Sequence, residues 1–107
     1  MIKHIVFVRF KPNTALSDIE AIFTKIGNLQ SILPAMKSYD YGRYNGSNER
    51  YKGFDYAFYM EFDTVEERDA YLIHPEHVKV GKALRAMLDT DGSDSFFAFD
   101  YDTSRLI

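Results

Sequence analysis

The chain has 107 residues, a length typical of one small domain and too short for a two-domain enzyme with its own cofactor domain. Hydrophobic residues make up 46% and charged residues 27%, the balance of a folded globular protein rather than a disordered segment. A net charge of -3, with no stripe of Lys or Arg, argues against nucleic acid as a partner. The chain contains no Cys, hence no disulfide or thiolate, which favours a cytoplasmic location.

The first residues give no sign of export or membrane insertion. The segment from Met1 to Phe10 is interrupted by Lys3, His4 and Arg9 and has no small-residue cleavage site. It is therefore neither a signal peptide nor a membrane span, and we expect the protein to begin at Met1 and not to bind a membrane.

The N-terminal third predicts a strand followed by a helix. Ile2 to Phe10 is rich in β-branched and aromatic residues, and the turn signal Lys11-Pro12-Asn13 closes it. Ser17 to Glu20 fits a capping box, in which a hydroxyl and a carboxylate satisfy the free amides at a helix start. Apolar residues then recur at spacings of three and four, and Pro34 limits the helix to about Leu33.

The middle of the chain predicts two strands and a short helix. The strands are Met36 to Tyr44 and Phe54 to Phe62, separated by a polar connection from Asn45 to Gly53. Every even position of the second strand is apolar, which predicts one buried face, with Phe54, Phe58 and Phe62 as core beneath the helices. Thr64-Val65-Glu66-Glu67 is a second capping box, opening a helix to about Ile73.

The last third predicts a helix from Pro75 to about Leu88, a polar loop from Asp89 to Asp94 and a strand from Phe96 to Tyr101. His77 falls on the apolar stripe of that helix. The complete order is β-α-β-β-α-β with the second helix broken in two. This order predicts an α+β, ferredoxin-like fold with a four-stranded antiparallel sheet.

The aromatic content suggests how the second face of this sheet is covered. Nine Phe and eight Tyr make up 16% of the chain, and the first and last strands carry large apolar groups on both faces. Helices cover only one face, so we expect a second copy to pack on the other and close an α/β barrel. The alternative is a monomer with one wet, aromatic-rich face.

Four stretches of sequence resemble a known family in order and spacing. They are Tyr71-Leu72-Ile73-His74-Pro75-Glu76-His77-Val78, the opening strand from Met1, the segment Ile32 to Met36, and Phe99-Asp100-Tyr101. The first of these is similar to the His-Pro-x-His-Val signature of the stress-responsive dimeric α/β-barrel (Dabb) family. The resemblance spans nearly the whole chain and implies a single Dabb domain over residues 1–107. Members of that family range from stress-induced proteins without known chemistry to a plant polyketide cyclase.

The resemblance to the cyclase implies roles for four residues. His77 would be a general base, Asp100 would orient it, Tyr71 would place a hydroxyl against a carbonyl, and His4 would line the pocket. The sequence departs from the cyclase at Ile26, where the cyclase has a tyrosine that helps to hold substrate. The residues expected to line the pocket are His4, Val6, Val8, Phe23 and Ile26.

The residue types support this assignment but also have simpler interpretations. An imidazole titrates near neutral pH, and an unpaired Asp100 among aromatic residues would be costly to bury. However, His77 could be a core histidine with one hydrogen bond, Asp100 could end its strand at the surface, and Tyr71 could be one more amphipathic ring. His74 and His77 form a poor metal pair, because no Cys or third ligand accompanies them. We expect no metal and no cofactor.

Three functions remain open at this point. The first is a homodimer with an apolar pocket for a small hydrophobic carbonyl or phenolic compound, acting as a cofactor-free cyclase, isomerase or lyase through His77, Asp100 and Tyr71. The second is a non-catalytic, stress-associated structural or binding protein. The third, by analogy of fold alone, is a cofactor-free monooxygenase-like dimer.

Overall fold

The computed structural model describes residues 1–90, 92 and 94–104. Its elements follow the predicted order: β1 (Ile2–Val8), α1 (Leu16–Asn28), β2 (Lys37–Arg43), β3 (Tyr56–Phe62), α2 (Val65–Ile73), α3 (Pro75–Ala86) and β4 (Phe96–Asp102). Two short 3-10 helices, η1 (Leu29–Ser31) and η2 (Glu49–Tyr51), lie in the connections. Residues 91 and 93 of the predicted polar loop lie outside the described residues.

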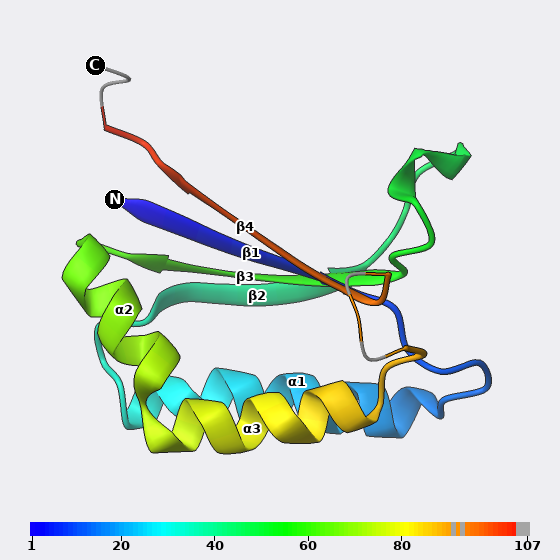
Figure 1. The fold of residues 1–107 in the computed structure, drawn as a ribbon, viewed down its shortest axis with the longest axis horizontal. Helices are drawn as coiled ribbons and strands as arrows, with labels where there is room; N and C mark the ends of the chain where they lie inside the picture. Colours follow the sequence, from blue (N-terminus) through cyan, green and yellow to red (C-terminus); the bar gives the residue numbers. More distant parts are fainter. Residues whose placement is uncertain (91, 93, 105–107) are drawn as a thin grey trace.

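The four strands form one antiparallel sheet in the order β2-β3-β1-β4. Helices α1 and α3 lie side by side beneath one face of this sheet, and α2 connects the end of β3 to α3 at the edge of that layer (Figure 1). The ferredoxin-like fold predicted from the sequence is therefore confirmed. Within the described residues, no helix has the length and apolar character needed to cross a membrane.

The helix starts show where local sequence signals hold and where they fail. Thr64 caps α2, because its hydroxyl oxygen accepts a hydrogen bond from the Glu67 backbone N–H at 3.1 Å. The predicted capping box at Ser17 is wrong. The cap position of α1 is Ala15, which makes no side-chain capping bond, and Ser17 already lies inside the helix.

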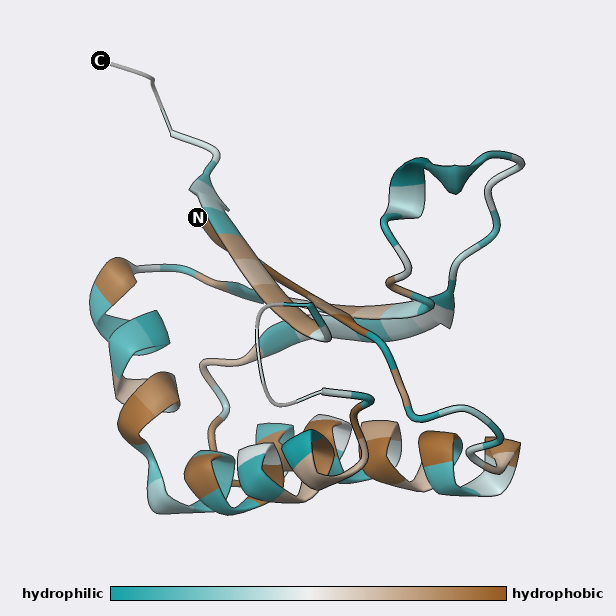
Figure 2. Cartoon of the chain, turned by 45° about the vertical axis from the view of Figure 1, so that its right-hand side comes forward, coloured by the Kyte–Doolittle hydropathy of each residue, from teal (hydrophilic) through white to brown (hydrophobic). Residues whose placement is uncertain are grey.

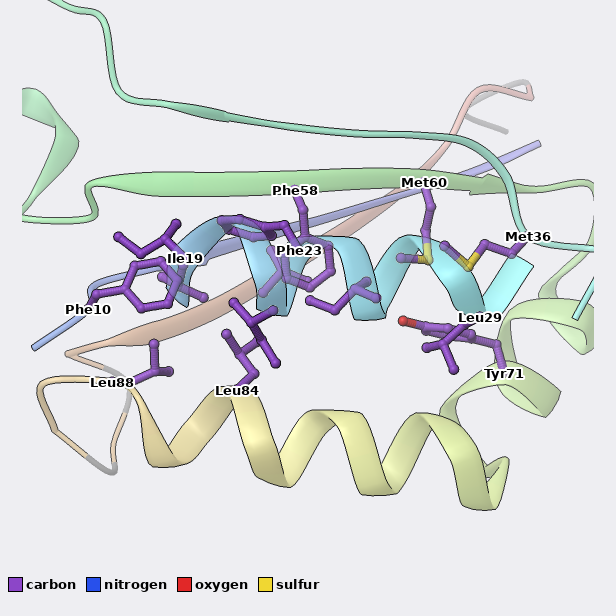
Figure 3. Packing of buried hydrophobic residues seen from close by; sticks show 14 of the residues in the cluster. Phe10, Ile19, Phe23, Leu29, Met36, Phe58, Met60, Tyr71, Leu84 and Leu88 are labelled. Atoms are coloured by element: carbon purple, nitrogen blue, oxygen red, sulfur yellow. The ribbon is translucent and has the colours of Figure 1, made fainter. Parts of the chain in front are cut away.

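The core lies between the helices and the sheet face they cover. In β1 the even-numbered residues are buried and the odd-numbered ones are partly exposed, as a period of two requires. Apolar side chains of α1 and α3 fill the space beneath these strands, with the ring of Phe23 at the centre (Figure 3). Phe23 lies within 6.0 Å of Phe10, Tyr41, Tyr56 and Phe58, measured between ring centroids. The predicted core residues Phe58 and Phe62 belong to this cluster.

The opposite sheet face carries many aromatic side chains, and no helix covers it (Figure 1). Phe97, Phe99 and Tyr101 of β4 lie on it with exposed fractions of 45%, 52% and 45%, and apolar colour runs along the strands as well as the helices (Figure 2). The prediction that Phe54 is core beneath the helices is wrong. Phe54 precedes the start of β3, and its ring lies 6.2 Å from Phe7 and 6.3 Å from Phe97, on the open side.

The connection between β2 and β3 rises above this open face as an arm (Figure 1). A cavity of about 710 Å³ lies between the arm and the sheet. Its walls include the rings of Phe7, Tyr51, Phe54 and Phe97. The open face is therefore a trough with an aromatic floor rather than a flat surface.

Candidate active site

A second cavity, of about 380 Å³, lies on the helical side of the sheet. Its walls come from β1, β3, β4 and all three α-helices and are mostly apolar. Three side chains at this cavity, His4 on β1, Tyr71 on α2 and His77 on α3, have chemistry suited to proton transfer. A pocket with apolar walls and a few convergent polar groups is the usual form of a small-molecule site.

The residues expected to line the pocket divide into two groups. His4, Val6 and Ile26 line the cavity. Val8 and Phe23 are instead fully buried in the core and are not among the lining residues. The division follows from position, since Val8 and Phe23 pack beneath the other end of the sheet, close to Phe10.

His77 is held by the end of the preceding helix. Its Nδ1 lies 3.0 Å from the backbone carbonyl oxygen of Leu72. A carbonyl only accepts hydrogen bonds, so Nδ1 carries the proton and Nε2 keeps its lone pair in the neutral ring. Burial lowers the pKa of His77 below its ordinary value, opposed in part by the Leu72 carbonyl. The ring at this cavity is therefore neutral near pH 7, with Nε2 able to accept a proton.

The break between α2 and α3 is built from His74 and Pro75. His74 caps α3, because its Nδ1 accepts a hydrogen bond from the Glu76 backbone N–H at 3.1 Å. Pro75 occupies the first turn of α3, where its missing N–H costs nothing. The two histidines of the His74-Pro75-Glu76-His77 segment thus differ in position: His74 caps the start of α3, and His77 lines the cavity.

Tyr71 lies close to both cavity histidines. Its ring centroid is 4.2 Å from that of His77 and 6.0 Å from that of His4. The side chain leaves α2, and its oxygen points into the space between helices and sheet (Figure 3). Burial raises the pKa of Tyr71 well above its usual range, so the hydroxyl stays protonated. Within the described part of the chain it makes no hydrogen bond, which leaves it able to donate to a ligand.

Asp100 contacts His4 rather than His77, so the expected His77–Asp100 pair is corrected. Asp100 Oδ1 lies 2.6 Å from His4 Nδ1, and Oδ2 accepts a hydrogen bond from Arg68 at 2.7 Å. The cause is the sheet register, which places Asp100 directly opposite His4 on the helical face. His77 uses its own Nδ1 on the Leu72 carbonyl.

Arg68 is the site residue that the sequence analysis missed. It lies three residues before Tyr71 in α2, and both residues therefore lie on the same face of that helix. Its guanidinium bonds Asp100 and also the neighbouring Asp69, at 2.8 Å. The three-residue spacing between Arg68 and Tyr71 could have indicated from sequence that both residues lie on one helix face. That Arg68 pairs with Asp100 depends on tertiary structure.

No group of three or more His, Cys, Asp or Glu side chains that could hold a metal ion occurs among the residues that the structure describes. His74 and His77 bind the chain itself, through Glu76 and Leu72. The polar groups at the cavity that suit proton transfer are the imidazoles of His4 and His77 and the phenol of Tyr71.

Comparison with known proteins agrees with the fold. The profile of the "Stress responsive A/B Barrel Domain" family, Dabb, matches residues 2–103. Olivetolic acid cyclase of Cannabis sativa is 29% identical over 100 residues, covering 94% of each chain. Hydroxynitrile lyase from Passiflora edulis has a TM-score of 0.82 at 25% identity, covering 97% of this chain and 95% of that one. A dimeric ferredoxin-like protein of unknown function from Jannaschia sp. has a TM-score of 0.82 at 22% identity, covering 95% and 98%.

Proposed function

This chain belongs to the stress-responsive α/β-barrel (Dabb) family, and from that premise we propose that it is a cofactor-free acid–base enzyme of the lyase or isomerase class. Its substrate is a small hydrophobic carbonyl or phenolic compound bound in the 380 Å³ cavity. The observation that carries the proposal is the hydrogen bond from His77 Nδ1 to the Leu72 carbonyl. That bond leaves Nε2 as a free base at an apolar cavity that Tyr71 also lines.

The chemical step is removal of a proton from the carbon next to a carbonyl. The C–H bond breaks, the proton goes to His77 Nε2, and the electron pair moves onto the carbonyl oxygen. The Tyr71 hydroxyl donates a hydrogen bond to the developing oxyanion, which lowers the barrier. The enolate carbon then attacks a second carbonyl to close a ring, and the alkoxide so formed takes the proton from His77 Nε2. In a conjugated substrate the dienolate instead takes that proton at its γ-carbon, which gives an isomer.

His4 and Asp100 provide a second, oriented imidazole at the cavity. Because a carboxylate only accepts hydrogen bonds, His4 Nδ1 carries the proton of its bond to Asp100, and in this tautomer Nε2 is the acceptor. In this proposal His4 accepts a hydrogen bond from a substrate hydroxyl, while Asp100 and Arg68 position His4. Two relatives reported above, a cyclase and a lyase, support this class of chemistry.

Hydrogen–deuterium exchange tests the step without knowledge of the natural substrate. Phenylacetone in D₂O serves as the probe, and proton NMR follows the loss of its benzylic C–H signal. We expect the protein to accelerate exchange over buffer, and His77→Gln to remove the acceleration. Tyr71→Phe should reduce it by roughly 10²-fold, in the range reported for loss of an oxyanion donor.

The matched control is His74→Asn, which removes a neighbouring imidazole but keeps an oxygen able to cap α3. Its exchange rate should equal that of the unmodified protein. Circular dichroism establishes that each variant is folded. If a folded protein binds phenylacetone without accelerating exchange, the site is a binding site, and the non-catalytic alternative replaces the enzyme.

We also propose that two copies pack through the open face of the sheet as a homodimer. Three rings of β4, those of Phe97, Phe99 and Tyr101, each expose about half of their surface there. Contiguous exposed aromatic surface of this kind marks an interaction site in a soluble protein. The Jannaschia neighbour of the same fold is described as dimeric, which supports the assignment.

Light scattering after size-exclusion chromatography tests the dimer. We expect twice the 12.4 kDa mass of one chain, and Phe99→Asp should shift the protein to the mass of one chain. Ile73→Asp is the control, because Ile73 is 79% exposed but lies at the end of α2, away from the open face. A monomeric unmodified protein, or a dimer unaffected by Phe99→Asp, contradicts this interface.

A further inference from the structure

The mouth of the 380 Å³ cavity carries positive charge that the acid–base chemistry does not use. Lys82 and Arg85 line the cavity from the second half of α3. Both side chains are exposed at its rim. No Asp or Glu is among the residues that line the cavity. The cavity therefore combines apolar walls with a positively charged rim.

Arg85 is held at this rim by an aromatic ring. Its guanidinium carbon lies 4.5 Å from the centroid of Phe96, which also lines the cavity. A cation over a ring face is attracted to it, so the guanidinium is held between α3 and β4. The planar fork of Arg is suited to binding a carboxylate through two parallel hydrogen bonds.

The partly buried carboxylate of Asp100 does not neutralise this rim. Asp100 is engaged by His4 and Arg68, behind the polar end of the cavity. In the described part of the chain, Lys82 and Arg85 form no ion pair. An anionic group on a ligand would therefore meet two cations and no competing acid.

The geometry points to a substrate that is an amphipathic monocarboxylate, with an apolar body in the cavity and its carboxylate bound by Lys82 and Arg85. This inference rests on the proposed function, since it concerns the ligand of the same cavity. An α-helix rises 1.5 Å per residue, so the two cations lie about 7 and 12 Å along α3 from His77. The reacting carbon lies at the His77 end, and the carboxylate lies that far away at the mouth.

A carboxylate fits this rim better than a phosphate. Phosphate sites usually combine cations with backbone N–H groups at a helix N-terminus. Here the cations lie toward the C-terminal end of α3, where the backbone presents carbonyl oxygens and the helix dipole is negative. A dianion is repelled more by those carbonyls than a monoanion is.

Three probes with a phenyl body test the inference by isothermal titration calorimetry: 4-phenylbutyrate, its neutral analogue 4-phenylbutyramide, and 3-phenylpropyl phosphate. We expect the carboxylate to bind at least tenfold more tightly than the amide. In Lys82→Gln/Arg85→Gln that preference should disappear, while the amide keeps its affinity. Lys79→Gln is the matched control, because Lys79 is exposed on the same helix and does not line this cavity.

The outcomes separate this inference from the proposed function. Equal binding of carboxylate and amide to the unmodified protein overturns the carboxylate assignment and leaves the apolar cavity in place. Tighter binding of the phosphate overturns the choice of a carboxylate. A preference that survives the double substitution shows that Lys82 and Arg85 are not its source. If none of the three probes binds, the cavity is not a site for such ligands, and both proposals fall.

Discussion

Asp100 lies directly opposite His4 in the ladder between β4 and β1, and its carboxylate joins His4 to Arg68 of α2. One side chain thus connects two strands and a helix at the polar end of the cavity. The side chains of Arg68 and Asp100 are only 20% and 23% exposed. Their pairing is therefore screened less by solvent than an ordinary surface ion pair.

Loss of the Arg68 contact should measurably destabilise the fold. We expect Arg68→Gln to lower the free energy of unfolding by about 1 kcal/mol, because Asp100 loses a charge-assisted hydrogen bond in a partly buried place. Urea denaturation measures the change. Lys37→Gln is the control, since the Lys37–Asp63 pair is 45% and 49% exposed and its loss should lower the free energy of unfolding by less than Arg68→Gln does. Equal effects of the two substitutions would mean that partial burial adds nothing to the Arg68 contact.

The pKa of His77 predicts a pH-dependent stability. Burial lowers this pKa in the folded state below the ordinary value of 6.5. The unfolded chain therefore takes up a proton at a higher pH than the folded protein does, and stability falls as pH drops from 6.5 through the folded pKa. Proton NMR of the imidazole gives the pKa, and urea denaturation across this range gives the stability.

His77→Gln is the corresponding variant, since it cannot bind that proton. The difference between its free energy of unfolding and that of the unmodified protein should change with pH only between the folded pKa of His77 and 6.5. An imidazole that titrates above 6.5 in the folded protein would contradict the neutral, base-ready state.

The two candidate helix caps should differ in their effect. Thr64→Ala removes the hydroxyl that accepts the Glu67 N–H, and we expect a loss of about 1 kcal/mol in the free energy of unfolding. Ser17→Ala should change it by less than about 0.5 kcal/mol, because Ser17 lies within α1 and caps nothing. Thermal or urea denaturation of both variants under one set of conditions measures the difference. A larger loss at Ser17 than at Thr64 would contradict the observed helix starts.

The aromatic centre of the core should carry a large share of the stability. Phe23 is fully buried, and its ring stacks on Tyr41 at a centroid distance of 4.5 Å. Phe23→Ala should cost about 3–5 kcal/mol, through lost burial and the cavity it leaves. Leu16→Ala, at a position 61% exposed on the same helix, should cost less than about 0.5 kcal/mol in the same denaturation experiment. A small effect at Phe23 would mean that the core closes around the missing ring.

The order of elements could be predicted from the sequence because it depends on local patterns. The period of two from residue 54 onward indicated β3, and the His74-Pro75 pair marked the break between helices. The same reasoning failed at Phe54, which keeps the alternation of the strand although the strand begins at Tyr56. Beyond the last paired residue, the chain turns the ring toward Phe7 and Phe97.

The candidate site was harder to predict, because its contacts join distant parts of the chain. His77 and Tyr71 could be identified from one short motif, and they do lie side by side. The partner of Asp100 could not, since it depends on which residue of β1 faces it across the ladder. A shift of the register by one residue would have put Asp100 on the open face. Arg68 was missed for the same reason, as its partner lies 32 residues away.

The interruption between α2 and α3 decides where a single proton sits. In an unbroken helix the Leu72 carbonyl would accept the backbone N–H of Glu76, four residues on. Here that N–H is taken by His74, and Pro75 begins a new helix. The carbonyl is left for His77 and fixes its tautomer. A proline that makes no contact with a ligand thus selects which nitrogen of the histidine can act as a base.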